Sequence, residues 1–238
     1  MKYSADLHIH SALSPCADNE MTPNNIVNMA LLKGLNIIAV TDHNSAGNIQ
    51  ALSRCAEGTG LLVVPGMELM TSEEVHLVCL LPNPEAALIV QDRVYEALPG
   101  IKNREEIFGQ QLLMDENDVI TGTVSQLLII AAAITLEEAS DMVESCGGVV
   151  IPAHIDRNSF SLISNLGMIP EKPAYKYLEL SKNCDVYDYR LQNPQLDKYK
   201  FIRSSDAHTL GDMLERETFF DLEQLSVECL LKKIHLKI

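Results

Sequence analysis

The segment DLHIHSALSPCADNEMTP, residues 6–23, places two histidines one residue apart at the end of an apolar run that starts at Tyr3. The run Tyr3–Ile9 has the residue types of a buried β-strand. On a strand, side chains at positions i and i+2 project from the same face, so His8 and His10 can hold one ion between them. An HxH pair alone is a weak signal, and the rest of the chain has to supply further ligands.

A helix is predicted directly after this segment. Thr22 has the residue type of an N-cap, Pro23 suits the first helical position, and Gly34 suits the stop. Strand-like and helix-like stretches then alternate along the chain, which is typical of an α/β fold with a parallel sheet covered by helices. The predicted strands are Tyr3–Ile9, Asn36–Val40, Leu61–Val64, Val75–Leu81, Gly148–Ile151, Tyr177–Leu180 and Lys200–Ser204.

Length and composition favour one domain over residues 1–238, since 47% of the residues are hydrophobic and can bury a full core. No apolar run reaches the ~18 residues that a membrane span needs, and the first residues do not resemble a secretion signal. We therefore expect a cytoplasmic protein without a membrane partner. The cysteines are scattered, so reduced thiols are expected; they are Cys16, Cys55, Cys79, Cys146, Cys184 and Cys229.

The formal net charge of −15 argues against a broad basic surface. From this charge we expect that the chain does not bind long nucleic acid. Bound multivalent cations could still create a positive pocket for a small anion within an acidic protein.

Residues 83–146 interrupt the alternation and are too long for an ordinary loop. The segment is predicted to be a helical insertion, with Asn103, Asp118 and Thr135 as candidate caps. It could cover a site as a lid, or it could be a peripheral packing element.

Six of the seven histidines fall at predicted strand ends, and only His235 does not. A single histidine is more often packed or solvated than bound to metal, but residues at the carboxyl ends of strands meet on one face of such folds. His76 fits less well because it stands at the start of its run. The six are His8, His10, His43, His76, His154 and His208.

Carboxylates accompany these histidines. Asp206 and His208 repeat the i, i+2 spacing, and Glu68 follows a predicted strand and could bridge two cations. In the first loop, Asp18 and Cys16 compete for one ligand position, and Asp18 could also be a solvated turn residue.

Two further acids stand next to candidate ligands. Asp6 and Asp42 either orient imidazole N–H groups or cap neighbouring backbone, and the sequence does not choose between these roles.

Taken together, DLHIH, TDH, the Glu68–His76 region, PAHIDR and SSDAH resemble the polymerase and histidinol phosphatase (PHP) family of metal-dependent phosphoesterases. The resemblance extends over nearly the whole chain. It implies a distorted seven-stranded, TIM-like β/α barrel with a cluster of three divalent ions at one end. Family members include histidinol phosphatases, nucleoside bisphosphate phosphatases, oligoribonucleotide exonucleases and nuclease modules of DNA polymerases.

The resemblance also implies how the ligands divide among the three ions. The first ion would have His8, His10, Asp206 and the bridging Glu68. The second would have Glu68, His76 and His154. The third would have His43, His208 and a residue of the first loop, for which we choose Asp18 over Cys16 because it stands four residues before Thr22, as the aspartate of some family members does.

This donor set suits Zn²⁺, Mn²⁺ or Fe²⁺. Such ions lower the pKa of bound water from ~15.7 toward ~7 and clamp phosphate oxygens. We therefore expect an enzyme that hydrolyses a phosphomonoester of a small molecule or nucleotide by a metal-activated hydroxide. Glu68, Asp206 and His208 are the expected catalytic residues. Arg157 and Lys182 are the candidate phosphate contacts, with Arg104 weaker.

Three alternatives stay open. The chain could be a nuclease acting on short oligonucleotides, a non-catalytic metal-binding PHP module, or an amidohydrolase-like enzyme that cleaves C–N bonds. The sequence does not decide the metal, the physiological substrate or the oligomeric state.

Overall fold

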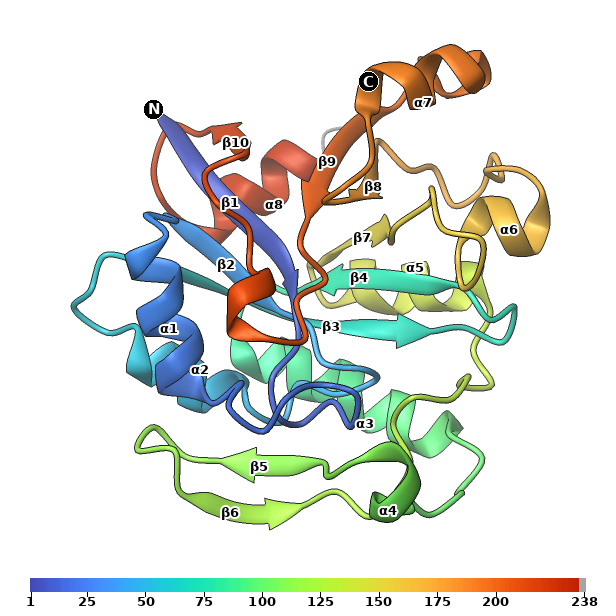
Figure 1. The fold of residues 1–238 in the computed structure, drawn as a ribbon. Helices are drawn as coiled ribbons and strands as arrows, with labels where there is room; N and C mark the ends of the chain where they lie inside the picture. The colour runs from blue at the N-terminus through green and yellow to red at the C-terminus, as the bar shows by residue number, and fades with distance from the viewer. Residues whose placement is uncertain (236–238) are drawn as a thin grey trace.

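A computed structural model describes residues 1–235 as a mixed α/β molecule built around a curled six-stranded sheet (Figure 1). The strand order is β10-β1-β2-β3-β4-β7. The pairs β1–β2 and β2–β3 are parallel, whereas β3–β4, β4–β7 and β1–β10 are antiparallel, so the all-parallel arrangement predicted from the sequence is wrong. The strands are β1 (Lys2–Ile9), β2 (Ile37–Val40), β3 (Leu62–Met70), β4 (His76–Leu80), β7 (Val149–Pro152) and β10 (Thr218–Asp221).

A second, two-stranded parallel sheet pairs β8 (Tyr177–Ser181) with β9 (Lys200–Ser204). Backbone hydrogen bonds tie it to both neighbours just beyond the strand ends: Ile155 N donates to Glu179 O at 2.9 Å, and His10 N donates to Ala207 O at 2.9 Å. The α/β class is confirmed. The described strands form a curled half-barrel with a separate pair beside it, and the predicted closed seven-stranded barrel is not confirmed.

The helices cover the outer side of this sheet, where the larger apolar cluster joins the strands to α1, α2, α3 and α5. A second cluster lies against α8. α1 starts as predicted, with Thr22 Oγ1 accepting the Asn25 N–H and Pro23 in the first turn. No helix within residues 1–235 is long and apolar enough to cross a membrane. The helices are α1 (Pro23–Leu32), α2 (Ile49–Cys55), α3 (Pro84–Ala97), α4 (Glu105–Phe108), α5 (Leu136–Ser145), α6 (Leu162–Leu166), α7 (Val186–Gln192) and α8 (Val227–His235).

The antiparallel pair β3–β4 explains two misfits of the sequence prediction. β3 continues through Pro65 and Gly66 to Met70, so Glu68 lies within the strand and not beyond its end. β4 begins at His76 and runs in the opposite direction, so its start lies at the edge where β1 and β2 finish. His76 therefore reaches the same edge as the other histidines from the amino end of its strand.

The segment 83–146 is only partly helical. It contains α3, α4 and α5, but a hairpin of β5 (Leu112–Met114) and β6 (Ile120–Thr123) lies between them. The insertion thus holds several helices together with a hairpin whose short β-strands pair across a turn, which the prediction of a helical insertion did not include. The hairpin packs on the first loop, with Leu112 N donating to Ala12 O at 2.9 Å. A lid function for this segment stays a prediction.

Of the three caps predicted in this segment, one is confirmed. Thr135 caps α5 in a capping box with Glu138. Asp118 lies in the hairpin turn with φ of 61°, a conformation that aspartate tolerates. Arg104, not Asn103, precedes α4.

Candidate metal centre

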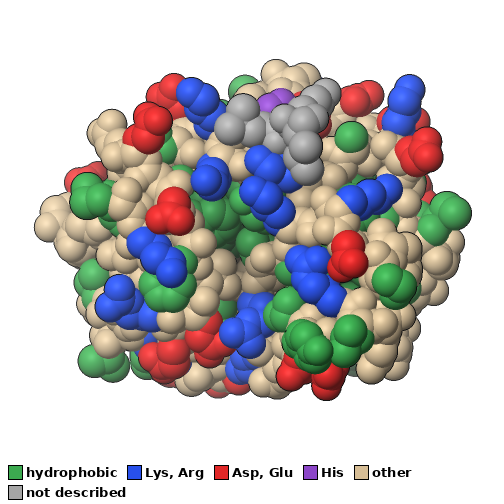
Figure 2. Space-filling model, turned by 90° about the horizontal axis from the view of Figure 1, so that it is seen from above, with side chains coloured by type: hydrophobic (Ala, Val, Ile, Leu, Met, Phe, Trp, Pro, Cys, Tyr) green, Lys and Arg blue, Asp and Glu red, His purple; other side chains and the backbone are tan. Residues whose placement is uncertain are grey.

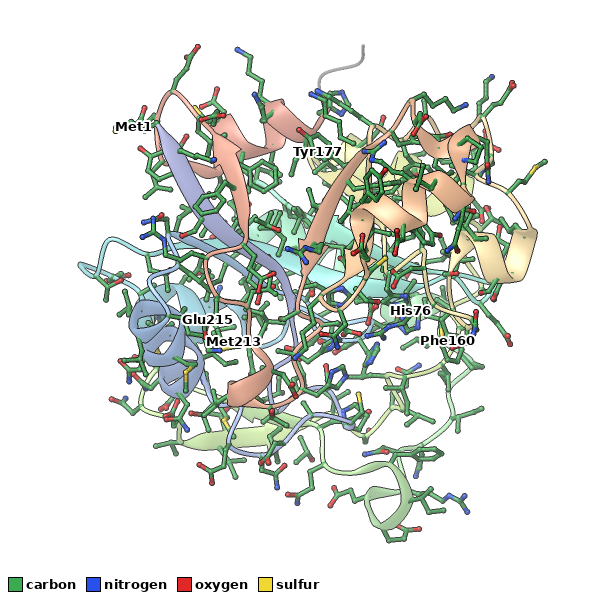
Figure 3. The ribbon with its side chains drawn as sticks, turned by 45° about the horizontal axis from the view of Figure 1, so that its top comes forward. Met1, His76, Phe160, Tyr177, Met213 and Glu215 are labelled. Atoms are coloured by element: carbon green, nitrogen blue, oxygen red, sulfur yellow. The ribbon has the colours of Figure 1, made fainter. Side chains whose placement is uncertain are left out.

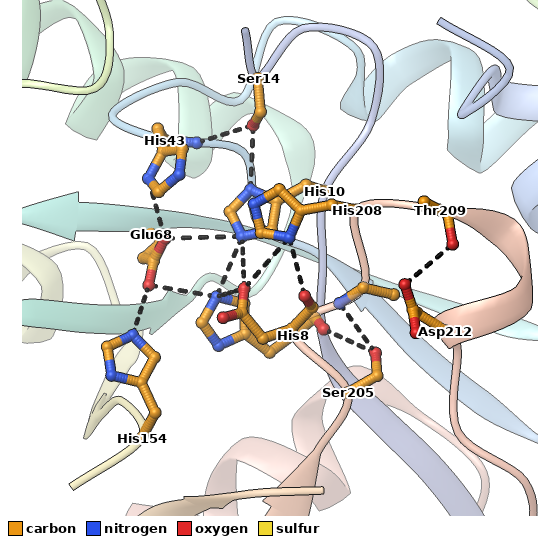
Figure 4. Close-up of polar contacts among 12 residues, drawn as sticks. His8, His10, Ser14, His43, Glu68, His154, Ser205, His208, Thr209 and Asp212 are labelled. Carbon is orange, nitrogen blue, oxygen red and sulfur yellow. Dashed lines mark hydrogen bonds and ion pairs between the residues drawn. The ribbon is translucent and has the colours of Figure 1, made fainter. Parts of the chain in front are cut away.

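Five imidazoles surround the carboxylate of Glu68 at one edge of the sheet, and Figure 4 shows His8, His10, His43 and His154 among them. Glu68 is 1% exposed, and each of its oxygens faces more than one ring nitrogen. Oε1 lies 2.7 Å from His76 Nδ1, 3.2 Å from His8 Nε2 and 3.3 Å from His154 Nε2. Oε2 lies 2.9 Å from His43 Nδ1 and 3.5 Å from His10 Nε2. Glu68 therefore lies between two sets of imidazoles, and its role as a bridging ligand stays a prediction.

Asp206 and His208 approach the same cluster from the loop after β9. Asp206 Oδ1 lies 3.0 Å from His10 Nε2 and 3.4 Å from His8 Nε2. The ring of His208 stacks on that of His10 with centroids 4.3 Å apart. Potential ligand atoms of the cluster gather in three overlapping groups, none of which includes Asp206; they are His8, His10 and Glu68; His43, Glu68 and His76; and His10, His43 and His208.

Backbone geometry brings these ligands together. His43 and Glu68 form an isolated parallel bridge, in which Asn44 N donates to Glu68 O at 2.8 Å. His154 and Asp206 both have a positive φ, of 30° and 51°. Non-glycine residues in this region are strained, and such strain concentrates at functional sites.

Hydrogen bonds fix how the first two imidazoles present their nitrogens. His8 Nδ1 lies 3.0 Å from Oε1 of the buried Glu179 on β8. His10 Nδ1 lies 2.9 Å from Ser14 Oγ, whose only hydrogen is donated to Asp42 Oδ1 at 2.7 Å. His10 Nδ1 must therefore be the donor, because the Ser14 oxygen has only lone pairs left. This leaves Nε2 of His8 and of His10 free to face an ion.

The two acids left open by the sequence have different roles. Asp6 caps backbone, accepting Ser205 N at 3.0 Å and Leu214 N at 2.9 Å. Asp42 accepts Ser11 N at 2.7 Å and also orients His10 through Ser14.

Glu179 and Ser14 were missed by the sequence reasoning. A single charged residue within the apolar run YLEL was a usable signal for Glu179. For Ser14 the sequence carries no comparable signal.

In this metal-free arrangement the acids and imidazoles shift one another's pKa. Burial opposes charge on Glu68, but the surrounding histidines outweigh it and hold the Glu68 pKa well below its usual range. Burial also lowers the pKa of His43, yet Glu68 and Cys16 raise it to about 10. The His8 pKa is raised well above its usual value because Glu179 and Glu68 outweigh burial. Protonated imidazoles thus supply the positive charge that the buried carboxylates require.

Unsatisfied polar atoms indicate that the cluster fits metal ions. Glu68 Oε2 and His76 Nδ1 are buried and make no hydrogen bond of good geometry, although they lie 2.9 Å from His43 Nδ1 and 2.7 Å from Glu68 Oε1, and the buried His154 Nδ1 has no hydrogen-bond partner among the described residues. Buried polar atoms are almost always partnered in folded proteins, so three in one cluster require an explanation. Imidazole nitrogens with carboxylate oxygens are a donor set for Zn²⁺, Mn²⁺ or Fe²⁺.

Cys16 and Asp18 of the first loop belong to none of the three ligand groups. Burial raises the pKa of the Cys16 thiol, but the neighbouring imidazoles of His208 and His43 lower it to about 7. The Asp18 side chain is exposed and accepts the backbone N–H of Glu20 at 2.9 Å. The described geometry therefore does not bring Asp18 to the position predicted for it.

The two predicted phosphate contacts differ in position. Arg157 Nη1 lies 2.6 Å from Asp206 Oδ2, directly at the cluster, and its side chain is 43% exposed. Lys182 Nζ instead pairs with Asp212 Oδ1 at 2.6 Å. Arg157 therefore stands at the ligand cluster, whereas Lys182 is engaged away from it.

An exposed aromatic side chain lies at the same edge (Figure 3). The Phe160 ring stacks on His76 with centroids 5.0 Å apart and an interplanar angle of 11°, and the residue remains 41% exposed. Its φ of 55° is unusual for a bulky residue. The sequence analysis did not single out Phe160, since one phenylalanine in a polar loop carries no signal.

The fold and this donor set define an α/β protein with a cluster of histidine and carboxylate side chains at one sheet edge that could hold metal ions. The chain belongs to the PHP domain family, whose profile matches residues 6–191, so the resemblance is confirmed.

Similar proteins are found among curated sequences and solved structures. A 5′-3′ exoribonuclease of Haemophilus influenzae is 32% identical over 78 residues, 32% of this chain and 27% of the exoribonuclease. Endonuclease Q of Pyrococcus furiosus, a lesion-specific endonuclease, superposes with a TM-score of 0.73 at 20% identity over 98% of this chain and 56% of its own. A candidate metal-dependent phosphoesterase of Bifidobacterium adolescentis gives 0.60 at 16% identity, covering 98% of this chain and 97% of its own. The chain thus spans about a quarter of the exoribonuclease and about half of Endonuclease Q.

The expectation that the chain excludes long nucleic acid is wrong. Endonuclease Q has also been solved with a 27-mer duplex carrying an abasic lesion at the active site, and that structure superposes with a TM-score of 0.71. Net charge was a poor guide because basic groups can cluster locally on an acidic protein. Figure 2 shows Lys and Arg side chains around an apolar hollow. Lys176 lies in such a group: burial lowers its pKa, and the positive charges of Lys200 and Lys233 lower it further.

Proposed function

We propose that this chain is a metal-dependent phosphoesterase that hydrolyses a phosphomonoester of a small molecule or nucleotide with three divalent ions, Zn²⁺, Mn²⁺ or Fe²⁺. The observation that supports this most is the convergence of five imidazoles on the buried carboxylate of Glu68. Glu68 Oε2 and His76 Nδ1 approach His43 Nδ1 and Glu68 Oε1 closely without hydrogen-bond geometry, which fits atoms aimed at an ion better than a structural salt-bridge network.

The family resemblance implies a division of labour that the three overlapping ligand groups support in part, since Asp206 and His154 belong to none of them. Glu68 would bridge, with His8, His10 and Asp206 on one side and His76 and His154 on the other, while His43 and His208 would hold the third ion. Bound divalent ions would supply an activated water and neutralise charge on the phosphate. Glu179 holds His8, and Ser14 with Asp42 holds His10, so both rings are oriented before any ion arrives.

Arg157 is the proposed contact for the phosphate. Its guanidinium lies on the Asp206 carboxylate in the metal-free arrangement and is partly exposed, so it can turn toward an anion once Asp206 binds a cation. His208 lies at the open side of the cluster, with Nδ1 2.8 Å from Asp206 O, leaving Nε2 for an ion or for the leaving group. Lys182 could contact a phosphate only after leaving Asp212.

A nuclease is the second candidate function. The observation that favours it is the exposed Phe160 ring beside His76, because an aromatic face next to a phosphate site can stack a nucleobase of any identity. An exoribonuclease and an endonuclease among the similar proteins support the same direction. Short 5′-phosphorylated ends and longer chains are both candidate substrates.

A substrate panel with metal-loaded protein separates these candidates. It compares histidinol phosphate, nucleoside 3′,5′-bisphosphates, short 5′-phosphorylated RNA, duplex DNA with an abasic site, and an amide. Phosphate release from the monoesters is expected. Cleavage of the RNA or DNA alone would favour the nuclease, amide turnover would favour an amidohydrolase, and bound metal without any turnover would favour a non-catalytic module.

A pair of variants connects any activity to the cluster. Glu68→Gln removes the bridging charge and should abolish turnover, whereas Glu137→Gln, on the exposed face of α5, should leave it unchanged. Equal activity of Glu68→Gln and the wild-type chain would contradict the proposed site.

A further inference from the structure

We propose that Phe160 is the specificity-determining residue of this centre, and that its ring stacks the base of a nucleotide whose phosphate is bound at the ligand cluster. The inference rests on the proposed phosphoesterase function and names the substrate class of that same site. The class is nucleoside phosphates, as distinct from phosphoesters that carry no base. A single side chain thus makes a selection that residues in contact with the phosphate alone cannot make.

The Phe160 ring lies flat against a candidate metal ligand (Figure 3). Its centroid is 5.0 Å from that of His76, and the interplanar angle is 11°. His76 Nδ1 lies 2.7 Å from Glu68 Oε1, so one imidazole separates the phenyl ring from the carboxylate at the middle of the cluster. Phe160 nevertheless remains 41% exposed. Part of its aromatic surface is therefore open to a second planar group next to the site where a phosphate would bind.

The backbone holds Phe160 in this exposed position. Its carbonyl oxygen accepts the N–H of His76 at 2.9 Å, which ties it to the first residue of β4. The next residue, Ser161, caps α6 with its side chain and donates its hydroxyl to Arg157 O at 2.9 Å. The φ of Phe160 is 55°, a strained conformation for a bulky residue. Because such strain concentrates at functional sites, this combination favours a binding role for the ring.

One short loop between β7 and α6 carries both the ring and the proposed phosphate contact. Arg157 Nη1 lies 2.6 Å from Asp206 Oδ2, whereas Phe160 stacks on His76, so the guanidinium and the ring contact different residues of the cluster. The two residues are three positions apart, so their Cα atoms are separated by at most about 11 Å. A phosphate bound at Arg157 therefore leaves its nucleoside within reach of the Phe160 ring.

Stacking provides a selectivity that phosphate contacts lack. The guanidinium of Arg157 would pair with the phosphate of any phosphoester. A phenyl ring instead stabilises a flat base of any identity, and replacing such a ring by alanine weakens binding by about 5-fold to 150-fold per base. We therefore expect the chain to favour adenosine 5′-monophosphate over ribose 5-phosphate, which has the same phosphoester but no base.

The ratio of kcat/KM for these two substrates, measured with metal-loaded protein, tests the selection. Phe160→Leu should lower the ratio by about 5-fold to 150-fold, because leucine keeps an apolar contact with His76 but has no flat face. Phe160→Tyr should keep the wild-type ratio. Phe219→Ala is the matched control, since Phe219 is 36% exposed on β10 and pairs with Ser4, at the opposite end of β1 from His8. Its ratio should not change.

A binding measurement tests the same contact without turnover. The ligand is a nucleoside 5′-phosphonate that carries 2-aminopurine as its base. It cannot be hydrolysed, because a P–C bond replaces the ester bond, and the fluorescence of 2-aminopurine is quenched when the base stacks. Quenching should saturate with the metal-loaded wild-type chain and with Phe160→Tyr, and it should be lost in Phe160→Leu. Metal analysis and circular dichroism of each variant exclude loss of ions or of folding as the cause.

The two measurements separate this inference from the proposed function. Equal kcat/KM ratios for the wild-type chain and Phe160→Leu would overturn the role of Phe160, and so would the absence of quenching with the wild-type chain at saturating phosphonate. A wild-type chain that quenches the base through Phe160 but hydrolyses no phosphoester would refute the proposed function while supporting the stacking contact. Equal hydrolysis of both substrates by every variant would do the reverse.

Discussion

His8 shows how one ligand depends on a residue from a distant strand. Its Nδ1 lies 3.0 Å and 3.1 Å from the two carboxylate oxygens of Glu179, and both side chains are buried. We expect Glu179→Gln to lower metal affinity by about 10-fold to 100-fold, the usual effect of losing a carboxylate behind a ligating histidine. Competition with a chromophoric chelator measures this affinity.

Glu217→Gln is the control for that experiment, because Glu217 is exposed and pairs with Arg203 outside the cluster. Its metal affinity should match that of the wild-type chain. If Glu179→Gln also kept the wild-type affinity, the positioning role of Glu179 would be ruled out.

His43 gives the centre a definite pH dependence. Burial lowers its pKa, but Glu68 outweighs burial and raises it to about 10 in the metal-free chain, so His43 carries a proton at neutral pH. A metal ligand must be neutral, so binding should release protons, and apparent affinity should rise with pH until the His43 pKa is passed. Titration calorimetry of Zn²⁺ at neutral pH, in buffers of different ionisation enthalpy, counts these protons. Heats that do not depend on the buffer would contradict the prediction.

The sequence predicts most residues of the cluster but not Glu179 and Ser14, which orient its imidazoles. His8, His10 and Asp206 stand in short motifs whose i, i+2 spacing has a direct geometric meaning. The choice between Asp18 and Cys16 depends instead on how a loop folds, and the Asp18 turn with Glu20 is a local hydrogen bond that spacing does not reveal. Glu179 joins His8 across 171 residues of sequence, so only the fold pairs them.

At the element scale, the β3–β4 pair positions two ligands, and Gly66 permits its close approach. A Cβ on Gly66 would lie 2.6 Å from the carbonyl oxygen of Cys79 on the neighbouring strand. We expect Gly66→Ala to lower the free energy of unfolding by about 1–3 kcal/mol, as overpacking does in cores. Chemical denaturation, followed by circular dichroism, measures the change.

Gly211→Ala is the matched substitution, because nothing lies within 4 Å of a Cβ at that position. It should change the free energy of unfolding by less than Gly66→Ala does. Equal effects of the two substitutions would show that the β3–β4 contact is not the cause.

All seven predicted strands exist, because short apolar runs bounded by turns are strong signals. The direction of each strand was harder to predict from the sequence than its existence. The turn between Met70 and His76 is short, and a short connection favours an antiparallel pair, which was the available signal for β3–β4. The hairpin of Leu112–Thr123 was missed since its strands are only three and four residues long.

At the scale of the whole molecule, the centre joins distant parts of the chain, so metal should stabilise the fold. One cluster of metal ions would be bound by residues from four strands or their ends, which are His8 on β1, Glu68 on β3, His154 after β7 and Asp206 after β9. We expect metal-loaded protein to unfold at a higher denaturant concentration than chelator-stripped protein. Bound metal should raise the free energy of unfolding by about 2.7 kcal/mol when free metal is 100 times its Kd. His8→Ala should reduce this difference, and superimposable curves for loaded and stripped wild-type chain would refute it.

The overall class could be predicted because motifs from the whole chain agreed with the alternating pattern. Closure of the barrel could not, since it depends on hydrogen bonds between strands that are far apart in sequence. Here β8–β9 pairs as a separate sheet, and backbone hydrogen bonds from His10 N to Ala207 O and from Ile155 N to Glu179 O join it to β1 and β7 near the strand ends. The effect of the net charge of −15 was misjudged because surface charge acts locally.

Anomalous X-ray diffraction from crystals of protein loaded with Zn²⁺ or Mn²⁺ tests the central claim most directly. Strong anomalous peaks should lie between Glu68 and the surrounding imidazoles, with one of them beside His43 and His208. Diffraction data that place the ions elsewhere, or that show no ion among these side chains at saturating metal, would contradict the account.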